Sequence, residues 1–159
     1  MAVKAGREII DALNEVLTAE LTAINQYFLH AKMMESWGYL RLYEKVHRES
    51  IDEMKHSNRV IERILYLDGV PNVQRLGRVR IGEQIEEMFR ADVALEEEAI
   101  PRLNSAIALC REHGDSGTRH LLEEILVDEE EHLDWLEAQL HLIGEVSLQG
   151  YLAQQIREE

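Results

Sequence analysis

The chain has 159 residues, enough for one domain with a hydrophobic core and too few for two comfortable ones. Its formal net charge of −14 argues against nucleic-acid binding, which needs basic patches, and favours cationic partners such as metal ions. The one cysteine, Cys110, excludes an intrachain disulfide, a zinc ribbon and an iron–sulfur cluster held by this chain alone. We therefore expect a single domain over residues 1–159.

The N-terminal residues lead directly into a charged amphipathic pattern, without the apolar stretch of a signal peptide. Nothing in the chain approaches the length and hydrophobicity of a transmembrane span. A lone cysteine also fits a reducing compartment. We expect a cytoplasmic protein that does not bind membranes.

Hydrophobic periodicity predicts two long helices in the first half of the chain, over about residues 7–35 and 39–67. A carboxylate, Glu20, falls inside the apolar stripe of the first of them. That helix carries a second apolar stripe, which a bundle helix with one buried face does not need. A subunit interface or partial burial by a neighbouring helix would each explain the second stripe, which consists of Leu21, Ile24 and Phe28.

A long extended connection is predicted after the second helix. Gly69 and Pro71 break the helical pattern, and residues 78–81 alternate polar and apolar side chains. About 15 residues of extended chain span roughly 50 Å. A helix of about 28 residues is only about 42 Å long. The connection can therefore cross the whole length of a helix bundle.

Hydrophobic periodicity in the second half of the chain predicts two more long helices, over about residues 82–112 and 117–144. Asp115 or Ser116 is the expected N-cap of the latter. A short fifth helix follows over about residues 147–157, interrupted at Gly150. It is too short to be stable alone and must dock on the rest of the molecule. Four long helices with one long crossover predict an all-α four-helix bundle.

One spacing of acidic residues occurs twice. In each half of the chain a glutamate is followed 33 positions later by a Glu-x-x-His motif. Residues three apart share a helix face, so each motif aims a carboxylate and an imidazole at one point. Counting from the two expected helix–helix turns places the glutamates of each half at one level, and counting from the ends of the crossover, Leu67 and Gly82, brings Glu53 level with Glu96. The residues are Glu20, Glu53 and His56, then Glu96, Glu129 and His132.

This layer predicts a dinuclear carboxylate metal site inside the bundle. Cations would remove the repulsion of four clustered carboxylates. One imidazole per metal with several carboxylates suits iron or manganese better than zinc. Tyr27 lies on the same face as Glu20 and is either a hydrogen-bond donor to one of these glutamates or an ordinary core tyrosine. The alternative for the whole set is six surface charges with a coincidental spacing.

Three stretches of the chain resemble bacterioferritins, namely residues 20–30, 49–56 and 128–137, and the resemblance covers essentially the whole length. It implies a ferritin-like four-helix bundle with one crossover and a short fifth helix. It also implies a hollow shell of 24 subunits that oxidises Fe²⁺ with O₂ or H₂O₂ at intrasubunit di-iron centres and stores the Fe³⁺ mineral. By the family pattern, the six residues above are the ligands, and Glu53 and Glu129 bridge both irons.

The resemblance also implies haem b, held between two subunits by one methionine from each. The matching residue is Met54, which follows Glu53 and therefore points about 100° away from the metal site. Two such methionines related by a two-fold axis can ligate one haem iron from both sides. Without the resemblance, an outward methionine would be read as interface packing.

The chain departs from the family at Arg48. Some bacterioferritins carry a histidine there, which forms an accessory iron site on the inner surface with the residue that matches Asp52. Arginine stays protonated and cannot bind a metal. We expect no accessory site, so that iron reaches the mineral through the di-iron centre itself. Four further histidines match no ligand position and are expected at the surface or in packing: His47, His113, His120 and His141.

The partners implied are Fe²⁺, the oxidant and a ferredoxin-type reductant for iron release, while co-assembly with a second subunit type stays open. Rival functions are a rubrerythrin-like peroxidase, a manganese catalase, a haem-binding electron-transfer assembly and a DNA-protecting miniferritin. Against the first, this chain has no Cys-x-x-Cys, which a rubredoxin partner domain needs. A miniferritin places its ligands across a subunit interface and often has a basic tail, and neither fits this chain.

Overall fold

The computed structural model describes residues 6–157. Residues 1–5 and 158–159 of the predicted domain lie outside the described residues. The expected absence of a signal peptide rests partly on residues 1–5. The four long helices are α1 (Arg7–Ser36), α2 (Leu40–Tyr66), α3 (Ile85–Glu112) and α4 (Ser116–Ala153).

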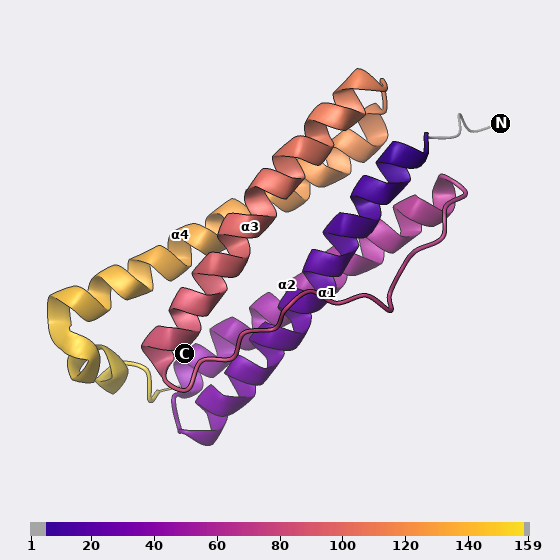
Figure 1. The fold of residues 1–159 in the computed structure, drawn as a ribbon. Coiled ribbons are helices and arrows are strands. Elements are labelled where there is room, and N and C mark those ends of the chain that lie inside the picture. The colour runs from indigo at the N-terminus through magenta and orange to yellow at the C-terminus, as the bar shows by residue number, and fades with distance from the viewer. Residues whose placement is uncertain (1–5, 158–159) are drawn as a thin grey trace.

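The helices form two antiparallel pairs that pack side by side, α1 with α2 and α3 with α4 (Figure 1). Between residues 6 and 157 the chain forms no strand. The predicted all-α bundle is therefore confirmed, and the helix boundaries lie within a few residues of those expected from the sequence.

The crossover between α2 and α3 runs along the bundle in an extended conformation (Figure 1). Its backbone N–H groups find acceptors on α1, where three polar side chains four residues apart face it. These contacts satisfy the backbone N–H groups of an extended segment that does not pair with a strand. Thr22 Oγ1 accepts from Gly77 at 2.8 Å, Gln26 Oε1 from Arg80 at 3.0 Å, and His30 Nε2 from Gly82 at 3.1 Å.

The same side chains reach a buried carboxylate on α3. Gln26 Nε2 donates to Asp92 Oδ1 at 2.8 Å, and His30 Nδ1 lies 3.0 Å from the same oxygen. Asp92 is only 1% exposed. One buried polar cluster therefore joins α1, α3 and the crossover, and nothing in the sequence pattern pointed to it.

Helix α4 begins at the predicted cap. The Asp115 side chain accepts from the Thr118 backbone N–H at 3.0 Å, and Arg63 of α2 donates to the same carboxylate at 3.0 Å. Gly117 lies close to this guanidinium, because a Cβ there would come within 2.6 Å of Arg63 Nη2. The N-terminus of α4 is thus fixed to α2 through one arginine.

Helix α4 is divided at Ser147, where φ is 71° and ψ is 159°. The segment beyond folds back as the predicted short fifth helix (Figure 1, yellow end). It docks through buried Tyr151, whose hydroxyl donates to Gln139 Oε1 at 2.7 Å. The prediction that Gly150 interrupts the fifth helix is wrong. Gly150 is helical and its N–H donates to Ser147 Oγ at 3.2 Å, so the serine caps the new helix.

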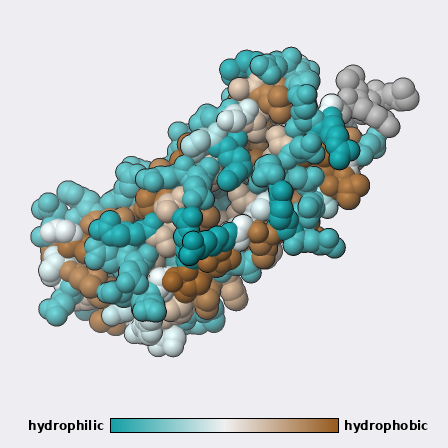
Figure 2. All heavy atoms as spheres, in the orientation of Figure 1, coloured by the Kyte–Doolittle hydropathy of each residue, from teal (hydrophilic) through white to brown (hydrophobic). Residues whose placement is uncertain are grey.

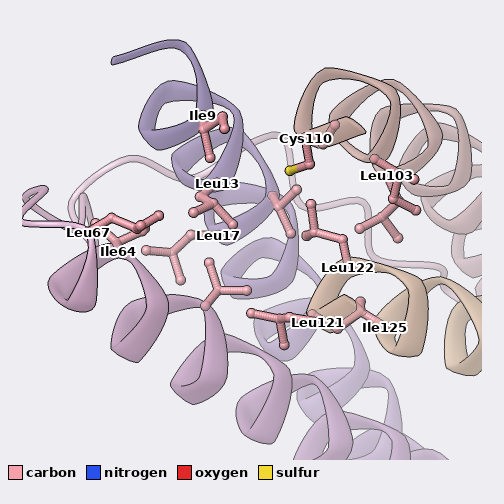
Figure 3. Close-up of a cluster of buried hydrophobic side chains, with 14 residues drawn as sticks. Ile9, Leu13, Leu17, Ile64, Leu67, Leu103, Cys110, Leu121, Leu122 and Ile125 are labelled. Atoms are coloured by element: carbon pink, nitrogen blue, oxygen red, sulfur yellow. The ribbon is translucent and has the colours of Figure 1, made fainter. Parts of the chain in front are cut away.

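The apolar core consists of two clusters. Figure 3 shows the one around Leu13 of α1, Ile64 of α2, Leu103 of α3 and Leu122 of α4. The second lies toward the other end of the bundle and includes Phe89. On every helix the predicted metal-binding glutamate lies in sequence between the two clusters: Glu20 between Leu17 and Ala23, Glu53 between Val46 and Val60, Glu96 between Phe89 and Leu103, and Glu129 between Ile125 and Leu136.

Candidate metal centre

The structure brings all six predicted ligand residues together in the middle of the bundle. Each long helix supplies one glutamate, and all four glutamates are at most 2% exposed. They form two overlapping groups with the histidines, and within each group one ligand atom per residue lies within 4.8 Å of all the others. Glu53 and Glu129 belong to both groups, which otherwise contain Glu20 and His56, and Glu96 and His132.

This geometry follows from helix periodicity. Each Glu-x-x-His lies in the interior of a regular helix, where residues three apart share a face. The short turn after α1 and the short turn after α3 return the chain at equal depth. The two halves of the site are therefore built alike, as their equal spacing predicts.

The first histidine presents one ring nitrogen to the carboxylates. His56 Nδ1 lies 3.4 Å from Glu20 Oε2 and 3.2 Å from Glu129 Oε1. Its Nε2 lies 2.9 Å from Asp128 Oδ2 on α4. A carboxylate behind a metal-binding histidine fixes the orientation and tautomer of the ring. Asp128 is thus a positioning residue that the sequence analysis did not identify.

The second histidine has different neighbours. His132 Nδ1 lies 3.2 Å from Glu96 Oε1 and 3.8 Å from Glu49 Oε2. The Tyr27 hydroxyl donates to Glu96 Oε1, and its ring meets the His132 ring edge-on with centroids 5.0 Å apart. Of the two readings of Tyr27, the structure thus supports the hydrogen-bond donor. Glu49 was not predicted, although its position four residues before Glu53 places it on the same face of α2.

Burial and the mutual repulsion of the carboxylates favour the protonated form of two of the four glutamates, Glu53 and Glu129. Burial raises the pKa of Glu53 well above its usual value, and the nearby carboxylates of Glu20 and Glu129 add to the shift. The pKa of Glu129 is raised in the same way, by burial and then by Glu20. Burial alone would also raise the pKa of Glu96, but hydrogen bonds from Glu129, His132 and Tyr27 outweigh it and lower the value.

The two imidazoles respond to the same carboxylates. Burial alone would lower the pKa of His56, but contacts with Glu129 and Glu20 outweigh burial and raise it to about 11. The pKa of His132 is also raised, because contacts with Glu96 outweigh its burial. Without a metal ion, protons on these side chains compensate the clustered negative charge.

The donor set fits two metal ions. Glu96 Oε2 is buried and has no hydrogen-bond partner within residues 6–157. Buried charges need pairing or a metal, and cations can take the place of the protons described above. Carboxylate oxygens with one imidazole nitrogen per ion are ligands that iron and manganese accept.

A cavity of about 490 Å³ adjoins this centre. Glu53, His56 and His132 form part of its wall, and Asp52 and Glu131 lie among its other lining residues. These side chains come from α2 and α4. The candidate centre therefore adjoins a cavity whose wall holds more carboxylates than lysines and arginines, which are Lys45, Lys55 and Arg59.

Met54 faces away from the centre, as predicted. Glu53 is 2% exposed, whereas Met54 is 53% exposed. Ile51, one turn earlier on α2, is exposed as well. On α1 the second apolar stripe is partly covered at Leu21 and Ile24 and half exposed at Phe28, so the bundle alone does not bury it.

The four histidines that match no ligand position lie outside the centre. His113 contacts Glu8 at 3.1 Å and His120 contacts Glu124 at 2.7 Å. His47 packs against aromatic rings and His141 is exposed. Among residues 6–157, no helix is both long and apolar enough to cross a membrane.

Comparison with known proteins agrees with this geometry. The ferritin-like domain family matches residues 10–146. Bacterioferritin from Mycobacterium leprae is 52% identical over 147 residues, which is 92% of each chain. Bacterioferritin BfrA from Mycobacterium tuberculosis is 49% identical over 147 residues, again 92% of each chain. Bacterioferritin from Streptomyces coelicolor is 49% identical over 151 residues, covering 95% of this chain and 90% of the relative. The chain therefore belongs to the ferritin family and, within it, to the bacterioferritins.

Proposed function

We propose that this protein stores iron by oxidising Fe²⁺ at the centre between its four helices and keeping the Fe³⁺ mineral inside a shell of 24 copies. The observation that carries the proposal is the pair of buried metal-binding groups that share Glu53 and Glu129. Two shared carboxylates hold two ions close enough to react with one oxidant molecule. The family membership of the chain supports the same function.

Iron is the substrate of this reaction. Glu20 with His56 holds one Fe²⁺, Glu96 with His132 holds the other, and Glu53 and Glu129 bind both. Two Fe²⁺ ions release two electrons, which reduce O₂ to H₂O₂, or H₂O₂ to water, with uptake of two protons. The ligand side chains supply negative charge and release their own protons when the ions bind. Asp128 holds the His56 ring in place.

The test removes one ligand at a time. Glu20→Ala and Glu129→Ala are expected to abolish fast Fe²⁺ oxidation, which the absorbance of the Fe³⁺ product reports. Their folds are expected to survive, because loss of a carboxylate relieves repulsion in the metal-free protein. Glu130→Ala, which removes an exposed carboxylate next to Glu129, is the control and should oxidise iron normally. Oxidation at the parental rate in both ligand variants would show that the centre lies elsewhere.

We further propose that Met54 binds haem b at a two-fold axis between two subunits. An exposed thioether on a helix face with exposed Ile51 is a ligand that a second copy of the chain can duplicate. Bound haem would supply one-electron transfer. Each subunit would contribute the methionine and the apolar side chains of α1 and α2 that the bundle leaves uncovered.

The assembly and its location complete the proposal. A shell is tested by the mass of the purified protein in solution, which separates a 24-subunit store from smaller bundle enzymes. We place the protein in the cytoplasm, where its lone buried thiol, Cys110, stays reduced. Release of stored iron then needs an electron donor, for which a ferredoxin-type protein is our candidate.

A further inference from the structure

A small pocket with several arginines lies where the crossover passes between α1 and α3. Its volume is about 90 Å³. Three arginines line it, Arg78 and Arg80 of the crossover and Arg102 of α3. Thr18 of α1 and the carboxylates Glu15 and Glu98 also lie in its wall. We call this site the arginine pocket.

The charges in the arginine pocket do not balance. Each carboxylate in the wall already has a cationic partner, because Glu15 contacts Arg75 at 2.6 Å and Glu98 contacts Arg80 at 3.2 Å. Arg78 and Arg102 have no ion-pair partner within the part of the chain that the structure describes. Two arginines that form no ion pair among the described residues therefore share one small pocket, Arg78 exposed and Arg102 half-buried, on a chain whose net charge is −14.

The donors suit an oxyanion. A guanidinium presents several N–H groups in a planar fork that matches carboxylate and phosphate oxygens. Thr18 Oγ1 accepts a hydrogen bond from Arg75 Nε at 3.2 Å, so its own proton can be donated to a ligand. The pocket, at about 90 Å³, has room for a tetrahedral anion.

We propose that the arginine pocket binds a free tetrahedral oxyanion, of the chemical class of inorganic phosphate. Arg78, Arg102 and Thr18 would donate to it, and Arg80 would share its guanidinium between the anion and Glu98. The pocket lies behind the metal centre, because its lining residues Ala19 and Leu95 adjoin Glu20 and Glu96 in sequence. The bound anion would thus offset the arginine charge on the α1 and α3 side, opposite the acidic cavity on α2 and α4.

The test measures phosphate binding to the metal-free protein by titration calorimetry. It needs no iron, so its outcome is independent of the proposed ferroxidase function. One saturable site per subunit is expected in the parent. Arg78→Gln and Arg102→Gln are each expected to weaken binding about tenfold, the usual loss for one hydrogen bond to a charged group. Sulfate should compete with phosphate, because the pocket recognises shape and charge.

The matched control is Arg90→Gln, which removes the same charge from an exposed position on α3 where the arginine pairs with Glu86 at 3.0 Å. It should change phosphate affinity less than about twofold, since exposed charges at a distance are screened by salt. Saturable binding that is absent, or weakened as much by Arg90→Gln as by Arg78→Gln, would overturn the proposal. Tighter binding of ADP than of phosphate would also overturn it, because the ligand would then be part of a larger molecule.

Discussion

Glu53 and Glu129 distinguish this bundle from one that merely carries many acidic residues. Both are buried, both belong to each candidate metal-binding group, and the pKa of both carboxyl groups is raised by burial and by neighbouring carboxylates. A helix rarely places a glutamate in a core unless a partner or a metal compensates it. The same two carboxyl groups therefore link the stability of the metal-free protein to pH.

The stability of the metal-free protein is expected to fall as the pH rises. Glu53 and Glu129 have folded-state pKa values above the ordinary 4.5, so their contribution is fully present below about pH 4.5 and is lost as pH rises through the raised values. His56 acts in the same direction, because its contribution is present below 6.5 and is lost toward about 11. Thermal unfolding of metal-free protein between about pH 5 and pH 8 measures the effect.

Two controls accompany this measurement. Saturating Zn²⁺, which has no redox chemistry, should remove most of the pH dependence because the metal replaces the protons. Glu129→Gln, which keeps the shape and loses the charge, should flatten the curve. A midpoint that stays constant or rises over this range in the metal-free parent would contradict the assigned protonation of the centre.

Arg48 gives a second prediction at the scale of a residue. Asp52 lines the cavity of about 490 Å³, and Arg48 precedes it by one helical turn. Arg48→His is expected to add an ordered iron beside Asp52 in iron-soaked crystals, because a neutral imidazole is a ligand and a guanidinium is not. Arg48→Gln is the control without a ligand. An ordered iron close to Asp52 in the parent would show that the imidazole is unnecessary.

Helix α1 has two functions on two of its faces. One face carries Glu20 and Tyr27 toward the metal centre, and another carries Thr22, Gln26 and His30 toward the crossover. The extended segment is thereby held by side chains in place of a neighbouring strand. The connection that gives the fold its topology thus depends on polar residues of a helix.

Gln26→Leu is expected to destabilise the protein by about 1–3 kcal/mol, because the Arg80 backbone N–H loses its side-chain acceptor and buried Asp92 loses a donor. Chemical unfolding of the metal-free protein measures the loss. Asn25→Ala is the control, since Asn25 is exposed and bonds only to Leu21 of its own helix. Its effect should stay within about 0.5 kcal/mol. Equal effects of the two substitutions would exclude a structural role for the buried cluster.

At the scale of the whole molecule, several apolar side chains are left uncovered by the bundle. Figure 2 shows hydrophobic patches among the hydrophilic side chains on the face along which the crossover runs. Val70, Val73 and Leu76 of the crossover are all at least half exposed, as is Met54 on α2. A single bundle that leaves such residues in water is suited to assembly with further copies.

Met54→Leu is expected to abolish haem binding while leaving Fe²⁺ oxidation and the assembled mass unchanged. Leucine keeps the apolar volume and removes the sulfur ligand. The visible spectrum of the purified protein, with the protein-to-haem ratio, measures the result. Met33→Leu makes the same chemical change on α1 and should retain haem. A Met54→Leu protein that retained its full haem content would show that the ligand lies elsewhere.

The sequence by itself determined the helices and the residues that meet at the candidate metal centre. Helical periodicity is a local property, so the repeated Glu-x-x-His and its partner glutamates at equal depth could be read without coordinates. Glycine and proline after α2, followed by alternating residues, likewise predicted the extended crossover. Burial of the glutamates followed from their place within apolar stripes, which the two core clusters on either side confirm.

Only the tertiary structure decided which of several equivalent residues makes a contact. Asp52 and Asp128 each precede a Glu-x-x-His, yet Asp128 contacts His56 at 2.9 Å, whereas Asp52 lies 3.9 Å from Lys55. The link from Gln26 to Asp92 was equally invisible in the sequence, as was the capping of the fifth helix by the Ser147 hydroxyl. Such contacts join residues far apart in the chain and depend on side-chain direction across helices. The periodicity of one helix therefore carries no information about them.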